Sequence, residues 1–285
     1  MAYETEQGNL IRIGNDISAE ISPNFAASTV GMNLVTVQQF SPEINVIKFR
    51  KAGSLTAAAV SESGSWSYGS GSELTDSSVT VTGAKVAQNA KVTVEALRFG
   101  AGQADFARVA AEQGRALARS YDDSLCALFP SLSQSVTATS TLTRDELLDA
   151  MQLIDAGNVP SGTLVAMLHA KQISDLRKEL SNDNGTPWSN ISLLDILGGR
   201  PQATGFAGNY AGIDLFQSNL VDNSGGNHQG ALFHPEYTFC SGVGGSFETN
   251  VQYEADDFLY KISSHFFYDV KEWNDGAGIL VLSDT

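Results

Sequence analysis

The side chains best suited to metal binding or to nucleophilic chemistry are few and lie far apart along the chain. They are Cys126, His169, His228, His234, Cys240 and His265. No two histidines have the His-x-x-x-His spacing that places both on one helix face, and the two cysteines are distant from each other. A zinc site would need at least three ligands brought together from separate segments. We therefore expect structural or surface histidines and no metal site.

Acidic residues offer one other route to catalysis. The stretch YEADDF places Asp256 beside Asp257, and a carboxylate pair is what a metal-free hydrolase would use. In a chain with 32 acidic residues, however, exposed acids are the expected background. The motifs of phosphate loops, dinucleotide sites, nucleophile elbows and calcium loops are each incomplete or absent. The sequence thus predicts no catalytic residue and no cofactor.

The composition indicates a soluble, acidic chain that can bury a large core. It has 285 residues, 42% of them hydrophobic, and no apolar run approaches the roughly 18 residues of a membrane span. The polar start MAYETEQGNL does not resemble a secretory signal, and two cysteines imply no disulfide framework. The net charge of −15 makes broad binding to nucleic acid or anionic lipid unfavourable.

Two alternating segments with a polar stretch between them predict a long β-hairpin. Residues 44–60 alternate, and so do residues 79–97, while the stretch between them, SESGSWSYGSGSELTDSS, is rich in serine and glycine. On the first strand, one face is expected to carry Ile44, Val46 and Lys48, and the other Asn45, Ile47 and Phe49. A protruding hairpin leaves backbone groups unpaired at its edges, which suggests that a partner covers them.

A single long helix is expected over residues 104–129, which contain no internal proline and end before Pro130. Its apolar stripe consists of Phe106, Ala110, Gly114, Leu117, Tyr121, Leu125 and Leu128. The opposite face is predicted to carry Asp105, Arg108, Glu112, Arg115, Arg119, Asp122 and Asp123. The helix would be roughly 39 Å long. Ala110 and Gly114 are small enough to let another element approach closely.

The remaining elements mix helices and strands. Thr143 and Glu146 form a capping box for a helix that stops at Gly157. Residues 163–169 are expected to form a buried strand, followed by an amphipathic helix with Ile173, Leu176 and Leu180 inward. Residues 1 to about 45 show no sustained period, so strand and helix both stay open there. Without a regular βαβ rhythm, the expected class is α+β.

The order of these elements resembles the major capsid protein of tailed double-stranded DNA bacteriophages, with the Hong Kong 97-like fold. Three stretches look most like that family: VIKFRKAGSLTAAAVSESGSW, DFARVAAEQGRALARSYDDSL and GFAGNYAGIDLFQSNLV. The resemblance implies an N-terminal arm (1–46) and an extended β-hairpin loop (47–98). It also implies a peripheral domain with the spine helix (99–165 and 246–272) and an axial domain (166–245 and 273–285).

The same resemblance implies a structural protein, not an enzyme. Copies would assemble as hexamers and pentamers into an icosahedral shell around double-stranded DNA, without binding the DNA specifically. The shell would be made in the host cytoplasm and become part of the virion, with no membrane involved. A separate scaffolding protein, a portal and a cement protein are the expected partners. Some relatives crosslink a loop lysine to a neighbour's asparagine, but residues 61–78 contain no lysine, so a non-covalent shell is expected.

The residues expected to contact a neighbouring subunit lie on the hairpin. Glu62, Trp66 and Tyr68 are near its tip, and Arg50 and Lys51 are at its base. Three other functions remain possible on the sequence alone. They are a cellular nanocompartment shell of encapsulin type, a carboxylate hydrolase, and a β-rich adhesin or tail component.

Overall fold

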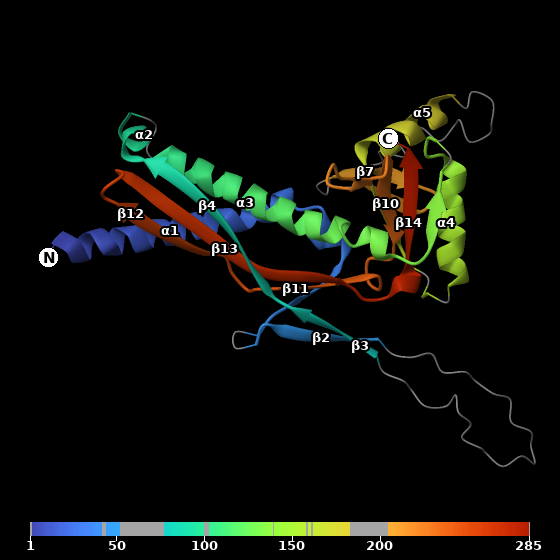
Figure 1. The fold of residues 1–285 in the computed structure, drawn as a ribbon, viewed down its shortest axis with the longest axis horizontal. Helices are drawn as coiled ribbons and strands as arrows, with labels where there is room; N and C mark the ends of the chain where they lie inside the picture. The colour runs from blue at the N-terminus through green and yellow to red at the C-terminus, as the bar shows by residue number, and fades with distance from the viewer. Residues whose placement is uncertain are drawn as a thin grey trace, which may run out of the picture.

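A long helix and a long strand lie side by side through the subunit (Figure 1). They are α3, Gln103–Cys126, and β13, Leu259–Glu272. The structure is a computed structural model that describes residues 2–41, 44–51, 77–99, 103–138, 140–157, 159–160, 162–182 and 205–284. The predicted helix is therefore confirmed, and it ends three residues before the expected boundary. A short 3-10 turn, η2 (Phe129–Ser131), then contains Pro130.

Antiparallel pairing around β13 forms the first sheet, which we call the β13 sheet. β11 and β12 pair with one edge of β13, and β4 pairs with the other. β1 extends the sheet by pairing parallel to β11. The bounds are Thr36–Gln39 for β1, Ala84–Thr93 for β4, Phe239–Val243 for β11 and Glu248–Glu254 for β12. A short helix, α2 (Val94–Phe99), follows β4.

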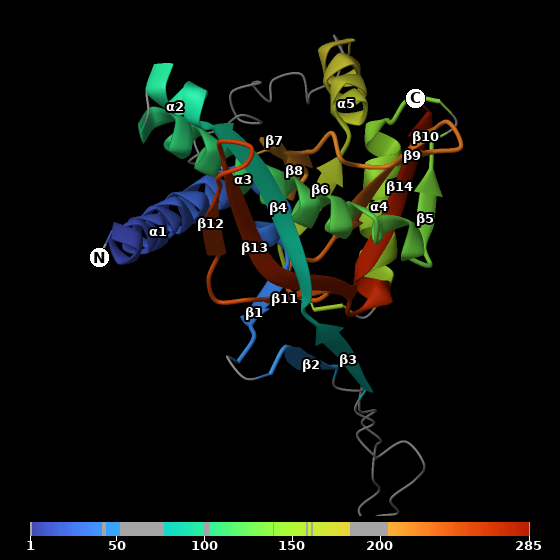
Figure 2. The ribbon, with the colours of Figure 1, turned by 60° about the vertical axis from the view of Figure 1, so that its left-hand side comes forward.

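A second sheet, the β10 sheet, lies at the other end of the subunit and is flanked by α4 and α5 (Figure 2). Its strand order is β5-β14-β10-β6-β8-β7, and β9 pairs with β10. The strands are β5 Ser135–Thr137, β6 Leu164–Leu168, β7 Phe206–Tyr210, β8 Ile213–Gln217, β9 Asn223–Ser224, β10 Asn227–Phe233 and β14 Gly278–Asp284. A 3-10 turn, η4 (Asp275–Ala277), leads into β14.

The two flanking helices, α4 and α5, form at the positions predicted from the sequence. α4 spans Arg144–Ala156, with the capping box of Thr143 and Glu146 at its start and Gly157 as its C-cap. α5 spans Ala170–Asn182 and buries Ile173 and Leu176. The buried strand predicted before it is β6, which is buried along its whole length.

The N-terminal segment forms a 27-residue helix, α1 (Ala2–Ser28), for which the sequence favoured neither helix nor strand. Its buried side chains recur every four residues at Ile17, Ile21 and Phe25. Pro23 lies inside the helix, and a proline there removes one backbone hydrogen bond. Because an isolated helix with such a residue is marginal, α1 depends on packing against α3 and β12.

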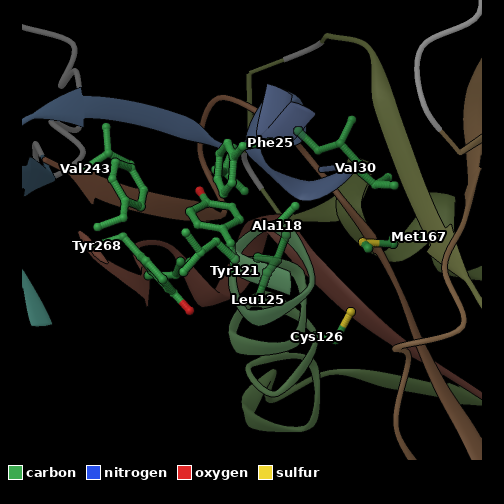
Figure 3. Close-up of a cluster of buried hydrophobic side chains, with 14 of the residues drawn as sticks. Phe25, Val30, Ala118, Tyr121, Leu125, Cys126, Met167, Val243 and Tyr268 are labelled. Atoms are coloured by element: carbon green, nitrogen blue, oxygen red, sulfur yellow. The ribbon is translucent and has the colours of Figure 1, made fainter. Parts of the chain in front are cut away.

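Aromatic side chains from α1, α3 and the β13 sheet meet in the core (Figure 3). The Phe25 ring lies 6.3 Å from the ring of Tyr121 and 5.5 Å from that of Phe266, measured between centroids. Tyr121 is in turn 5.2 Å from Tyr268. Burying each such side chain contributes about 1.5–3 kcal/mol. The predicted stripe residues Ala110, Leu117, Tyr121 and Leu125 are all buried here.

Candidate assembly surfaces

The base of the predicted hairpin is a two-stranded ribbon that leaves the body of the subunit (Figure 1). β2 (Val46–Lys51) pairs antiparallel with β3 (Ser77–Thr82), from Val46 opposite Thr82 to Lys51 opposite Ser77. The alternation expected along β2 is confirmed, because Phe49 is buried whereas Ile44, Val46, Lys48 and Arg50 are exposed. The return strand is divided at Gly83, beyond which β4 belongs to the β13 sheet.

Apolar contacts fix this ribbon to the β13 sheet. Phe49 and Val81 are buried against Cys240, and the Phe49 ring lies 5.8 Å from that of Trp273. A Cβ at Gly83 would lie 2.6 Å from the ring of Phe40, so any larger residue there would require this ring to move. The face of the ribbon that carries Phe49 and Val81 is therefore packed against the β13 sheet, while its other face is exposed.

Polar contacts complete the attachment. The Thr82 backbone N–H donates to Asp269 Oδ2 at 3.2 Å, and Lys51 Nζ donates to Asn274 Oδ1 at 2.5 Å. Arg50 is exposed opposite Ser78. Of the predicted contact residues, the structure thus places Arg50 and Lys51 side by side at the hairpin base. Glu62, Trp66 and Tyr68 lie outside the described residues.

Replacing Phe49 by alanine should release the ribbon without unfolding the subunit. Removing a buried phenylalanine side chain costs about 3–5 kcal/mol, and here the loss falls on a local cluster. We expect faster hydrogen exchange in β2 and β3 and an unchanged rate in α3. Lys48→Ala, on the exposed face of the same strand, should leave both rates as they are. Release of α3 together with β3 would show that the ribbon is part of the main core.

On the predicted charged helix face, Asp122 is the one residue that the structure contradicts among those whose burial it describes, and the side chain of Asp105 lies outside that set. It is buried, with 3% of its surface exposed, because its carboxylate holds the turn after α1. Oδ1 accepts from Thr29 Oγ1 and from the Gly31 N–H, both at 2.8 Å, and Oδ2 accepts from the Val30 N–H at 2.9 Å. Burial raises the pKa of this carboxyl group, and these hydrogen bonds counteract the rise in part.

An open groove of about 410 Å³ lies between β4 and α3. Its lining is mostly apolar, with Lys91 and Arg108 as its positive charges and Glu112 as its acid. Its residues are Gln88, Ala90, Lys91, Val92, Thr93, Ala96, Arg108, Val109, Glu112 and Gln113. Glu112 pairs with Arg115 at 2.8 Å. Within the described parts of the chain, neither Lys91 nor Arg108 forms an ion pair. The groove is therefore suited to a chain segment with carboxylates and small apolar side chains.

The residues considered for catalysis are not assembled into a site. Asp256 and Asp257 are exposed in the turn between β12 and β13. His265 pairs with Glu248 at 3.0 Å, and His234 is buried next to Gly162. Across the described residues, no group of three or more His, Cys, Asp or Glu side chains is arranged to hold a metal ion. Sequence reasoning did miss one juxtaposition, the stacking of His169 on His228.

Among the helices that the structure describes, none combines the length and the apolar character needed to cross a membrane.

No protein of curated function matches the chain by sequence. Solved structures that share its fold include three described in turn. The capsid of Ralstonia phage GP4 is 12% identical, with a TM-score of 0.67, over 91% of this chain and 90% of that one.

The other two are similarly distant in sequence. Mycobacterium phage Che8 gives 17% identity and a TM-score of 0.63, over 89% of this chain and 90% of that chain. A virus-like particle from Pyrococcus furiosus gives 11% identity and a TM-score of 0.58, over 94% and 98%. The profile of the phage capsid protein family matches residues 76–277, well over half of the chain. The chain therefore belongs to the phage capsid protein family, and the Hong Kong 97-like fold expected from its sequence is confirmed.

Proposed function

We propose that this protein is the major subunit of an icosahedral phage head, assembled from hexamers and pentamers around double-stranded DNA. The observation that carries the proposal is the hairpin base, which is fixed on its buried face and open on the other. The exposed strands of such a ribbon leave backbone groups unpaired in an isolated subunit, and a second copy can cover them. The family match favours this shell over a cellular nanocompartment. We infer that the protein acts through its contacts and not as an enzyme.

The contact residues we propose are Arg50 and Lys51 at the hairpin base and Glu62, Trp66 and Tyr68 near its tip. Lys51 also donates to Asn274 of its own subunit, so it fixes the base of the hairpin as well as contacting the neighbour. Arg50 is exposed beside it and faces the neighbour. The acceptor surface then combines α3 of the peripheral domain (99–165 and 246–272) with β4, which ends the extended-loop segment (47–98). The axial domain (166–245 and 273–285) lies toward the centre of each capsomer.

The acceptor we propose is the groove between β4 and α3 of the neighbouring subunit. Between Lys51 and Lys85 the sequence has no basic residue, but it contains Glu62, Glu73 and Asp76. The groove offers Lys91 and Arg108, neither of which forms an ion pair with another described residue of its own subunit. Charges of opposite sign across an interface select the partner and its register. Because of this charge complementarity, the groove should prefer the acidic loop of a second copy of this chain.

The remaining partners follow from the same proposal. The subunit meets a scaffolding protein, a portal and a cement protein in the host cytoplasm, and it ends in the virion. Each subunit has a net charge of −15, so the inner surface of the shell should bind the packaged DNA only weakly.

Reversing both groove charges, Lys91→Glu with Arg108→Glu, should prevent shell formation while the subunit stays folded. Electron microscopy and light scattering measure the particles, and circular dichroism measures the fold. Arg119→Glu, on the exposed face of α3 outside the groove, is the matched control and should assemble normally. Glu62→Lys with Glu73→Lys in the same chain should restore shells to the double reversal. Normal assembly of the reversed variant would refute the groove as acceptor, and a wild-type protein that stays monomeric with its scaffolding partner would refute the shell function.

A further inference from the structure

Two imidazole rings that are distant in sequence are stacked at the start of α5. The centroids of His169 and His228 are 3.8 Å apart, and their planes differ by 14°. His169 immediately precedes α5, and His228 belongs to β10. His228 is buried, with 6% of its surface exposed, and its Nδ1 atom has no hydrogen-bond partner among the described residues. Among the described residues, none accepts a hydrogen bond from this Nδ1 atom when it is protonated.

Hydrogen bonds at the same place tie the first turn of α5 to the β10 sheet. His169 Nδ1 accepts from the Lys171 N–H at 3.2 Å, which requires this nitrogen to be unprotonated. The buried Gln172 accepts through its Oε1 atom from the backbone N–H of His169 at 2.9 Å. Its Nε2 atom donates to the Val281 carbonyl at 3.2 Å and to the His228 carbonyl at 3.4 Å. Neutral imidazoles therefore fit this arrangement, and charged ones do not.

The charged groups around the two rings have opposite effects on the pKa of His228. On α5, Lys171 and Asp175 face the rings, and they pair with each other at 2.6 Å. On the neighbouring strands, Asp284 of β14 lies opposite Asn227, and the Asp222 carbonyl before β9 accepts from the Gln229 N–H. Burial lowers the pKa of both histidines. His169 and Lys171 lower that of His228 further, and Asp175 opposes them.

We propose that the His169–His228 stack is a proton-sensitive latch, which holds the first turn of α5 on β10 at neutral pH and releases it in mild acid. The first proton removes an acceptor from the Lys171 N–H or puts a charge on a buried ring without a partner. A second proton puts two like charges 3.8 Å apart. In both cases the rings must separate to reach water.

The direction of the pH effect follows from these pKa values. The unfolded chain binds protons on both histidines at about pH 6.5, whereas the folded subunit does so only at lower pH. The stability contributed by the neutral stack is complete above the unfolded pKa of about 6.5. It is lost as the pH falls from there toward the lower pKa values of the folded subunit. The latch is a property of the single subunit, so it can be tested without any shell.

Hydrogen exchange of α5, corrected for the intrinsic effect of pH, tests the latch on the full-length protein. We expect exchange at residues 170–179 to be at least about tenfold faster at about pH 5.5 than at about pH 8. The double variant His169→Gln with His228→Phe should lose this acid response. His234→Gln is the matched control, because His234 follows the opposite end of β10 and packs against Tyr237 and Gly162, which lie outside α5. It should respond as the wild type does.

An acid response that persists in the double variant, or that disappears in His234→Gln, would overturn the proposal. A wild-type α5 with equal protection at both pH values would overturn it as well. Should the double variant not fold, His169→Gln alone gives a second readout. The pKa of His228, followed by NMR, should then rise, because its imidazolium no longer faces the charge of His169. An unchanged pKa would show that the two rings are not coupled.

Discussion

Replacing Gly114 by valine should detach α1 from α3 and give the largest loss of stability of any single change considered. A Cβ at this position would lie 3.0 Å from the Ile21 carbonyl oxygen, 3.2 Å from the Phe25 nitrogen and 3.0 Å from Asn24 Cβ. Two of these atoms belong to the backbone of α1, so no side-chain rotation relieves the clash. Overpacking typically costs 1–3 kcal/mol, and separation of the helices also exposes the apolar face of α1, so we expect about 4 kcal/mol or more.

Urea unfolding measures this loss, and two variants make the interpretation specific. Gly114→Ala should cost less, because alanine favours the helix by about 1 kcal/mol over glycine and so offsets part of the clash. Gly245→Ala is the matched control, since a Cβ there has no neighbour within 4 Å, and it should leave stability unchanged. A valine variant as stable as the wild type would mean that α1 does not pack on α3 at this point.

Replacing Asp122 by alanine should lower the free energy of unfolding by about 2–4 kcal/mol. The change leaves three buried donors, from Thr29, Val30 and Gly31, without an acceptor, and each such group costs about 1–3 kcal/mol. Relief from burying the carboxylate offsets part of the cost, in keeping with its raised pKa. Asp123→Ala, at the next and exposed position, should have almost no effect. Equal losses in the two variants would contradict the role assigned to Asp122.

Asp122→Asn removes the charge and keeps one acceptor oxygen for the Thr29 and Gly31 donors, while the bond from the Val30 N–H is lost. Because the pKa of Asp122 is raised in the folded protein, folding is favoured when this group is protonated, and the part of the stability that depends on this proton is complete below the unfolded pKa of about 3.9. That contribution is lost as the pH rises through the folded pKa. The asparagine variant should lack this decline. A stability-against-pH curve identical to that of the wild type would assign the pH dependence to another group.

Much of the fold was predictable because its signals are local. The stripe of α3 repeats at helical spacing, and the capping box of α4 lies within four residues of sequence. The hydrophobic run of β6 is as long as the strand itself. Gly114 belonged to this group too, since a small residue in an apolar stripe indicates that another element comes close. Each of these patterns depends on hydrogen bonds or packing that a short segment arranges for itself.

The tertiary structure decided what depends on distant partners. α1 has an internal proline and a weak pattern, and only the surfaces of α3 and β12 make it a stable helix. Asp122 reads as a surface charge because nothing in its own sequence neighbourhood reveals the three donors from the turn after α1. His169 and His228 are 59 residues apart (228 minus 169) and meet only when α5 lies on β10. The sequence by itself determined the capsid class and the hairpin that extends from the subunit. The folded structure decided which face of that hairpin is buried and which stays open to a neighbour, because burial depends on what packs against a strand and not on the strand alone.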